Sequence, residues 1–271
     1  MKNKKYKGIL ILTLILLIFA FSVIAIKYPQ TEVSAGANVG ALSNQKIGWG
    51  IKRNDNHEQP DLGKKNLQLL EEVRGMAMGN KDKKYIYLTF DEGYEAGYTQ
   101  QILATLKEKQ VKATFFITAH YVNTQPDLVK QMIDEGHIVG NHTVNHKSMP
   151  DLTDEKINTE IMELHKVVQQ KFGYEMKYLR PPMGEYSQRT LALTKSLGYT
   201  TVMWSFAYQD WDEKKQPNEQ EALQKIVNNV HPGEIMLLHG NSKTNTNILG
   251  KMIDEVRPHG YEFKSLNEFE F

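Results

Sequence analysis

The sequence predicts an α/β protein, a distorted (β/α)7-type barrel with one N-terminal transmembrane or signal helix. Short apolar runs of strand type alternate, from residue 85 onward, with segments of helical spacing. This alternation favours a parallel sheet with crossover helices. Seven such strands in about 185 residues indicate a closed or nearly closed barrel of short elements, and an open doubly wound sheet is the alternative. An apolar run near the N-terminus supplies the additional helix.

The predicted elements follow from hydrophobic spacing and from residues typical of turns. Pro126 is typical of a first helical turn, and Gly136 and Gly173 are typical of helix ends. The strands are expected at 85–91, 113–118, 137–141, 178–180, 199–206, 234–239 and 261–263. The helices between them are expected at 98–110, 126–136, 153–171, 187–197, 217–230 and 246–258.

The first 27 residues have the pattern of an export segment. Four lysines precede the run 9–26, whose eighteen uncharged residues are just long enough to span a hydrocarbon core. Basic residues before the run keep that end in the cytoplasm, so the rest of the chain is expected outside. Small residues at 35–37 lie well past the run, which favours an uncleaved anchor over a cleaved signal peptide.

The expected domain organisation has four parts. Residues 1–27 form the signal or membrane anchor, 28–46 a tether, 47–82 an extension packed on the barrel, and 83–271 the catalytic domain. The expected localisation is extracytoplasmic, membrane-anchored or secreted.

Composition excludes several classes of protein. The chain has no cysteine, which excludes disulfide scaffolds, thiol nucleophiles and iron–sulfur sites. Its formal net charge of +1 is misleading, because the first 27 residues hold five lysines and no acid. The remainder is slightly acidic and has no basic run, so nucleic acid is not an expected partner.

Ionisable side chains follow five of the seven predicted strands. They are the pair Asp91-Glu92, the pair His142 and His146, and the single residues Arg180, Asp210 and His239. Because the carboxyl ends of barrel strands meet at one face, we expect these side chains to form one polar site.

A divalent metal is the expected cofactor of this site. His142 and His146 are four residues apart, so in a helical turn or a tight loop they face the same way. Imidazole suits zinc, the favoured metal, and also cobalt; manganese is a further possibility. Asp91 and Glu92 point to opposite faces if both are extended, unless the chain turns at Gly93. One carboxylate is then the ligand and its neighbour the base.

A general acid is expected at His239, at the end of the apolar run 235–238. A carboxylate at Asp210 would raise the pKa of this imidazole and fix its tautomer. Arg180 either holds the catalytic carboxylate or braces the strand end. Trp211 either stacks on a sugar, walls an acyl pocket or belongs to the core.

Five segments carry a family resemblance. They read TFDEG at 89–93, HTVNH at 142–146, RPPMG at 180–184, DW at 210–211 and LLH at 237–239. In this order they resemble the five motifs of the polysaccharide deacetylases, the NodB-homology carbohydrate esterases of family 4. The resemblance covers about residues 83–269. Within the family, the lead-in GWGIKR at 48–53 is similar to the N-terminal segment of the spore-cortex enzymes. Those enzymes deacetylate muramic acid on the way to muramic-δ-lactam.

The resemblance implies roles for individual residues. Asp91 would be the general base, oriented by Arg180. The backbone N–H of Met183 would stabilise the oxyanion. Asp210 would tune His239, which would protonate the leaving amine.

The resemblance also implies the ligands and the acetyl pocket. His142 and His146 would bind the metal, and Leu237 and Trp211 would line the pocket. Most members have Asp at the position of Glu92, where it completes the metal triad. The extra methylene of Glu92 leaves three possibilities, which are direct binding, binding through water or no binding.

The expected function is a metal-dependent hydrolase that removes N-acetyl from muramic acid. Peptidoglycan strands and the membrane are the expected partners, and the spore cortex is the expected place of action. Two alternatives stay open. One is a deacetylase of another N- or O-acetylated glycan, and the other is a non-catalytic glycan-binding module whose metal site has decayed at Glu92.

Overall fold

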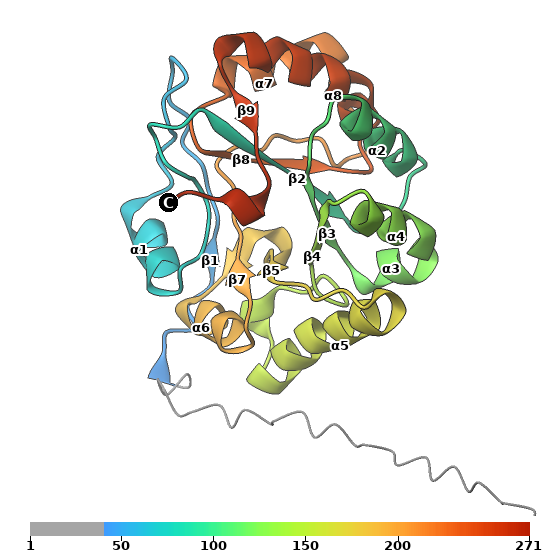
Figure 1. Cartoon of the computed structure of the whole chain (residues 1–271). Coiled ribbons are helices and arrows are strands. Elements are labelled where there is room, and N and C mark those ends of the chain that lie inside the picture. Colours follow the sequence, from blue (N-terminus) through green and yellow to red (C-terminus); the bar gives the residue numbers. More distant parts are fainter. Residues whose placement is uncertain (1–40) are drawn as a thin grey trace, which may run out of the picture. The chain divides into compact units, whose positions relative to one another are not determined.

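A computed structural model of the chain describes residues 41–271. The predicted anchor at 1–27 and most of the tether therefore lie outside the described residues. The centre of the described part is a curled, parallel, seven-stranded sheet in the order β7-β5-β4-β3-β2-β8, with β9 paired to β2 (Figure 1). Within residues 41–271, no helix has both the length and the apolar character needed to cross a membrane.

All seven predicted strands occur in this sheet, most of them shorter than expected. They are β2 (Tyr85–Glu92), β3 (Thr114–Ile117), β4 (Ile138–Asn141), β5 (Tyr178–Leu179), β7 (Thr200–Thr201), β8 (Glu234–His239) and β9 (Glu262–Phe263). Every ladder between neighbours is parallel. The open doubly wound alternative is wrong because the sheet curls on itself.

The expected distorted barrel, closed or nearly closed, is confirmed as a curled parallel sheet with helices, but the sheet forms only a half-barrel. The segment predicted as one strand at 199–206 pairs regularly only at β7, and it then crosses to the other edge of the sheet. The N–H of Val202 still bonds to Leu179 of β5, whereas the N–H groups of Ser205 and Phe206 bond to Ile235 of β8. Single hydrogen bonds therefore bridge the two edges where a closed barrel would have a ladder.

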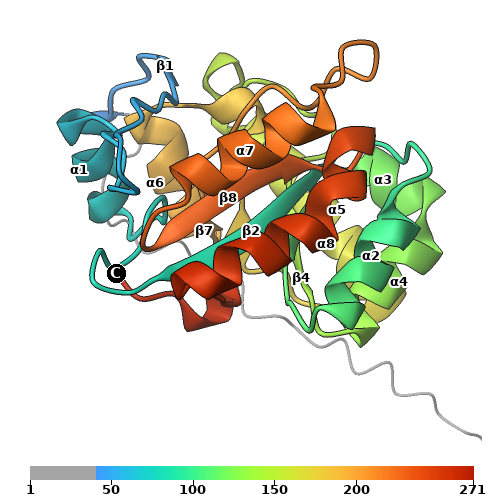
Figure 2. The ribbon, with the colours of Figure 1, turned by 90° about the horizontal axis from the view of Figure 1, so that it is seen from above.

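Helices cover the outside of the sheet, as Figure 1 shows and Figure 2 repeats from above. They are α2 (Thr99–Glu108), α3 (Ala119–Thr124), α4 (Pro126–Asp134), α5 (Asp154–Phe172), α6 (Gln188–Ser196), α7 (Glu219–Asn229) and α8 (Lys243–Val256). The Thr153 side chain caps α5 and Gly173 ends it with a φ of 64°. The sequence did not predict α3, and α8 begins three residues earlier than expected because Ser242 caps it.

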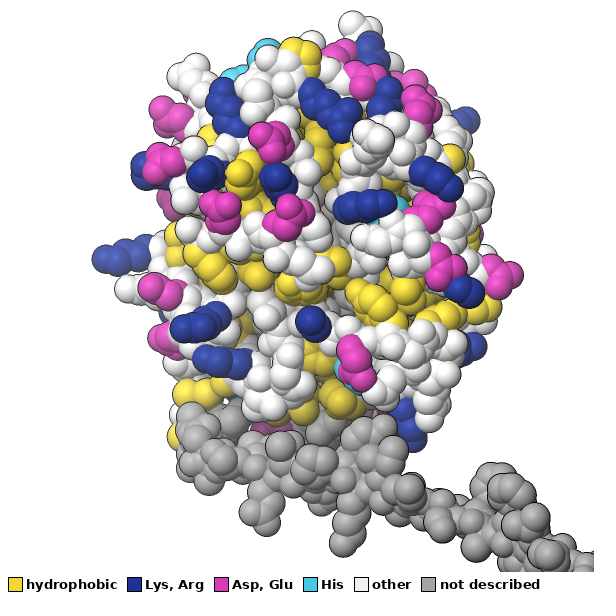
Figure 3. Space-filling model, viewed as in Figure 1, with side chains coloured by type: hydrophobic (Ala, Val, Ile, Leu, Met, Phe, Trp, Pro, Cys, Tyr) yellow, Lys and Arg dark blue, Asp and Glu magenta, His cyan; other side chains and the backbone are white. Residues whose placement is uncertain are grey.

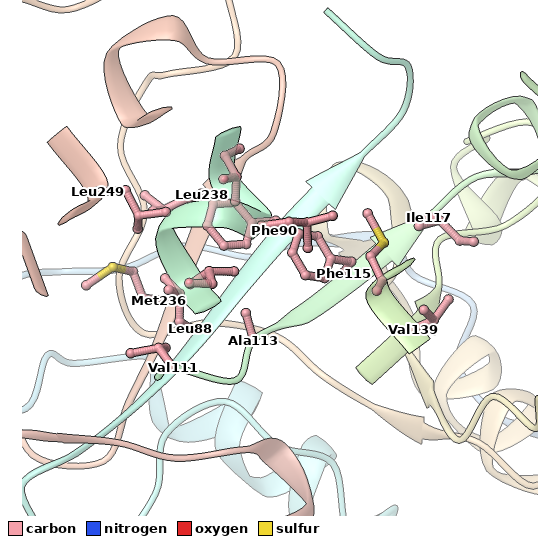
Figure 4. Packing of buried hydrophobic residues seen from close by; sticks show 14 of the residues in the cluster. Leu88, Phe90, Val111, Ala113, Phe115, Ile117, Val139, Met236, Leu238 and Leu249 are labelled. Atoms are coloured by element: carbon pink, nitrogen blue, oxygen red, sulfur yellow. The ribbon is translucent and has the colours of Figure 1, made fainter. Parts of the chain in front are cut away.

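Alternation along β2 decides which side chains enter the main core. Ile86, Leu88 and Phe90 face the helices and are buried in the main apolar cluster, as Figure 4 shows for the last two. Tyr87 belongs to a different cluster. Because successive side chains of a strand alternate, Asp91 shares the face of Tyr87, and Glu92 shares the face of Phe90.

The residues before β2 form a smaller layer beside the sheet. Strand β1 (Ile47–Gly48) pairs antiparallel with β6 (Glu185–Tyr186). Helix α1 (Lys64–Glu72) packs near α6 and contributes Leu69 and Leu70 to a separate apolar cluster. On the face of the molecule shown in Figure 3, acidic and basic side chains are interspersed with apolar ones.

Candidate active site

A groove of about 1000 Å³ opens at the carboxyl ends of the parallel strands. Seven of the ten predicted site residues line it, namely Asp91, His142, His146, Met183, Trp211, Leu237 and His239. Arg180 and Asp210 are fully buried behind the groove, and each contacts one of these residues. The tenth, Glu92, is elsewhere. The parallel sheet thus brings together residues that are far apart in the sequence.

Asp91 is fixed by a buried arginine. The Arg180 Nη1 donates to Asp91 Oδ1 at 2.7 Å, and the guanidinium lies 4.2 Å from the centre of the Phe116 ring. Burial raises the pKa of Asp91, but the positive charge of Arg180 and then His142 lower it by more, so that the pKa lies below its usual value. The carboxylate is therefore ionised at neutral pH. Arg180 holds the carboxylate, so its role is more than bracing the strand end.

His142 and His146 are brought together by a tight turn. Thr143 and His146 both have positive φ, and the N–H of His146 donates to Thr143 Oγ1. The His142 Nδ1 lies 2.8 Å from the Arg180 carbonyl oxygen, which fixes it as the protonated nitrogen. Burial lowers the pKa of His142 to about 4. Its ring is therefore neutral, with the Nε2 lone pair facing the groove.

The donor atoms at this point fit a late divalent metal. His142 Nε2 and His146 Nε2 are 3.1 Å apart, and Asp91 Oδ2 lies 3.4 Å from His142 Nε2. Neutral imidazole and carboxylate are the ligands that zinc prefers among nitrogen and oxygen donors. No group of three or more His, Cys, Asp or Glu side chains within 41–271 has the full arrangement of a metal site. The chain therefore presents a two-histidine site with one carboxylate beside it.

The structure does not bring Glu92 to these histidines. Strand β2 continues through Glu92, so the turn at Gly93 comes too late to redirect its side chain. The side chain is 1% exposed, and its carboxylate fills the space that a side chain at Gly240 would occupy. Neither carboxylate oxygen has a hydrogen-bond partner within residues 41–271. Burial, and then the charges of Glu95 and Asp91, raise the pKa of Glu92 well above its usual value. This geometry gives no support to the ligand role predicted for Glu92.

Asp210 and His239 form the second pair of the groove. The His239 Nδ1 lies 2.7 Å from Asp210 Oδ1, and the His239 backbone N–H donates to Asp210 Oδ2 at 2.9 Å. Burial lowers the pKa of His239, whereas the Asp210 carboxylate raises it by more, so that the net shift is upward. The imidazole thus has one nitrogen fixed by Asp210 and the other free to face a substrate.

Three further predicted residues form the walls. Met183 and Trp211 are 55% and 54% exposed, so the interpretation of Trp211 as a core residue is wrong. Leu237 lies at the base of the groove, 5% exposed. Met183 has a φ of 58°, a left-handed conformation that is unusual for a residue with a side chain and often marks a functional site.

The geometry agrees with comparisons to known proteins. The polysaccharide deacetylase family model matches residues 78–202. The peptidoglycan-N-acetylmuramic acid deacetylase PdaA of Bacillus subtilis is 42% identical over 87% of this chain and 90% of its own length. This chain belongs to the polysaccharide deacetylase family. The solved structure of PdaA, a family 4 carbohydrate esterase, matches with a TM-score of 0.82 over 84% of this chain and 98% of that one. A family 4 carbohydrate esterase from Bacillus anthracis matches with a TM-score of 0.72 and 44% identity, over 84% of this chain and 98% of its own.

This deacetylase also has groove residues that sequence reasoning missed. Tyr94, Tyr208 and Asn241 line the groove. The Asn241 Nδ2 donates to Tyr94 Oη at 2.8 Å and to the Trp211 carbonyl oxygen at 3.1 Å. All three lie within three residues of a predicted site residue, at the same strand ends. That proximity was the available signal.

Proposed function

We propose that this deacetylase hydrolyses the N-acetyl group of muramic acid in peptidoglycan. The observation that carries the proposal is the pairing of a fixed carboxylate with a fixed imidazole in one groove. Asp91 is held by Arg180, and His239 is held by Asp210, beside the neutral His142. The choice of muramic acid is supported by the likeness to PdaA, which is named for that substrate.

Asp91 acts as the general base. Its lowered pKa keeps it ionised at neutral pH, and Arg180 fixes which oxygen faces the groove. It takes a proton from the water that attacks the acetyl carbonyl carbon. A positioned acid or base of this kind contributes about 10²–10⁴-fold to the rate.

His239 acts as the general acid. Amide nitrogen is a poor leaving group until it is protonated, and the raised pKa of His239 supplies a proton near neutral pH. The backbone N–H of Met183, on the wall of the groove, is the proposed donor to the oxyanion. Leu237 and Trp211 enclose the acetyl group between them.

We propose zinc as the cofactor, with cobalt and manganese as the alternatives. His142 and His146 would hold it, with Asp91 Oδ2 as the neighbouring oxygen. When bound, such a metal acidifies water and polarises a carbonyl group.

The proposed place of action is outside the cytoplasm, during formation of the spore cortex. The export pattern of residues 1–27 and the similarity of the lead-in at 48–53 to spore-cortex enzymes support it. Deacetylation leaves an amine on the same sugar as the lactyl carboxyl group. Condensation of these two groups, with loss of one water, gives the muramic-δ-lactam.

Mass spectrometry of glycan strands tests the proposal. Peptide-stripped peptidoglycan is incubated with the soluble domain and zinc, with a chelator-treated sample as the control. We expect loss of acetyl confined to muramic acid and no loss with the chelator. Loss of acetyl from glucosamine residues would instead show that the substrate is another acetylated sugar. No loss from any acetylated glycan would favour a non-catalytic binding module.

A further inference from the structure

A chain of hydrogen bonds leads from the groove wall to the general acid. The Tyr208 hydroxyl donates to Asn245 Oδ1, and the Asn245 Nδ2 donates to Asp210 Oδ2 at 2.5 Å. Asp210 Oδ1 in turn lies 2.7 Å from His239 Nδ1. Tyr208 lines the groove, whereas Asn245 and Asp210 are each only 1% exposed.

The position of Asn245 is fixed by α8. It lies in the first turn of the helix, where its backbone N–H donates to the capping Ser242 Oγ at 3.2 Å. The orientation of its amide is fixed as well. The Tyr208 hydroxyl donates to the Asn245 amide oxygen, so the amide NH₂ group faces the Asp210 carboxylate. With the amide reversed, its oxygen would face the carboxylate oxygen, and neither atom can donate a hydrogen bond.

Among residues 41–271, Asn245 supplies the one side-chain amide that bonds to the Asp210 carboxylate, whereas the Gln216 amide donates to the Asp210 backbone carbonyl oxygen. Its Oδ2 accepts from Asn245 Nδ2 and from the His239 backbone N–H, while its Oδ1 faces the imidazole. Without the amide, one donor to Oδ2 is lost and the buried carboxylate can turn about its Cβ–Cγ bond. Groups that orient a catalytic imidazole are worth about 10–100-fold in activity, and small displacements cost similar factors.

We infer that Asn245, oriented by Tyr208, is a positioning residue for the general acid His239. The inference rests on the proposed function. It assigns to Asn245 a role in protonating the leaving amine, and none in binding the acetyl group or the metal. Loss of Asn245 therefore slows substrates whose leaving group needs a proton and spares those whose leaving group departs as a stable anion.

The test compares two substrates in Asn245→Ala and wild type. The first is the acetylated glycan, and the second is nitrophenyl acetate, whose phenolate leaves without protonation. We expect kcat on the glycan to fall about 10–100-fold with KM unchanged, and the rate on the ester to change less than about threefold. His239→Ala is the benchmark for this selective loss.

Asn247→Ala is the matched control. Asn247 lies on the same helix, is exposed, and bonds to Glu219 instead of Asp210. We expect both rates to stay at the wild-type value. If Asn245→Ala does not fold, Tyr208→Phe replaces it in the test. Because Tyr208 orients the Asn245 amide, this variant must also lower the rate on the glycan relative to the rate on the ester.

With an active wild type, one outcome overturns the inference. It is an unchanged glycan-to-ester ratio in the folded variants, whether both rates fall equally or neither falls. A wild-type enzyme that deacetylates no glycan contradicts the proposed function instead, so the two failures are distinguishable.

Discussion

Replacing Glu92 with Gln changes how stability depends on pH. The wild-type side chain is 1% exposed, and in the described part of the chain its carboxylate oxygens have no hydrogen-bond partner. Its pKa in the folded chain lies well above the usual 4.5, because burial and the nearby charge of Glu95 disfavour the anion. The unfolded chain therefore releases this proton at a lower pH than the folded chain does.

The sign and size of the effect on stability follow from this difference between the folded and unfolded pKa. A raised folded-state pKa contributes stability below the unfolded value, and that contribution is lost as the pH rises toward the folded value. The loss has a limiting slope of about 1.4 kcal/mol per pH unit. Gln has nearly the same shape and does not titrate. The advantage of Glu92→Gln over wild type should therefore grow with pH above 4.5, by up to about this slope.

Urea unfolding of both proteins at several pH values between 4.5 and 8 measures this advantage. We expect the free energy of unfolding of Glu92→Gln, relative to wild type, to rise with pH above 4.5. A difference that is the same at every pH would refute a pKa of Glu92 that folding raises by burial.

Three further predictions concern the site. The Asp91→Asn variant should lose turnover but remain folded, which circular dichroism checks. Its free energy of unfolding, measured with urea, should fall by about 3–5 kcal/mol because buried Arg180 loses its charged partner. His146→Ala should weaken zinc binding in calorimetry whereas Glu92→Gln should not, and equal weakening by both would restore Glu92 as a ligand. Asp210→Asn should move the basic limb of the kcat/KM profile to lower pH, because burial lowers the pKa of His239 and the Asp210 carboxylate no longer raises it. Asp91 and Arg180 are the other charges that face His239. A basic limb at the wild-type pH would contradict the pairing of Asp210 with His239.

The sequence was most informative where side chains follow a regular repeat. Strand β8 has the predicted bounds, and α5 begins and ends within a residue of its prediction, because an apolar run and a Thr–Gly pair of caps are local signals. The strand ends then placed Asp91 and His239 in one groove, with Asp210 buried behind it against His239, since parallel topology fixes which ends meet.

The features that the sequence did not predict depend on tertiary contacts, which no local pattern encodes. The segment 199–206 looks like one strand, but its partners change from β5 to β8 within four residues. The direction of Glu92 was decided by whether β2 turns before or after it. Asn245 lies inside a helix with no motif around it, and only the fold brings its amide to Asp210.

The fate of oxygen in the reaction shows whether a water deprotonated by Asp91 hydrolyses the acetyl amide. Glycan strands rich in acetylated muramic acid are treated with wild type and with Asp91→Asn in water enriched in heavy oxygen, and the acetate and glycan masses are measured. We expect one heavy oxygen in each released acetate, none added to the glycan, and a free amine on muramic acid. We expect no acetate with Asp91→Asn. Unlabelled acetate, or full activity of Asp91→Asn, would contradict hydrolysis by a water that Asp91 deprotonates.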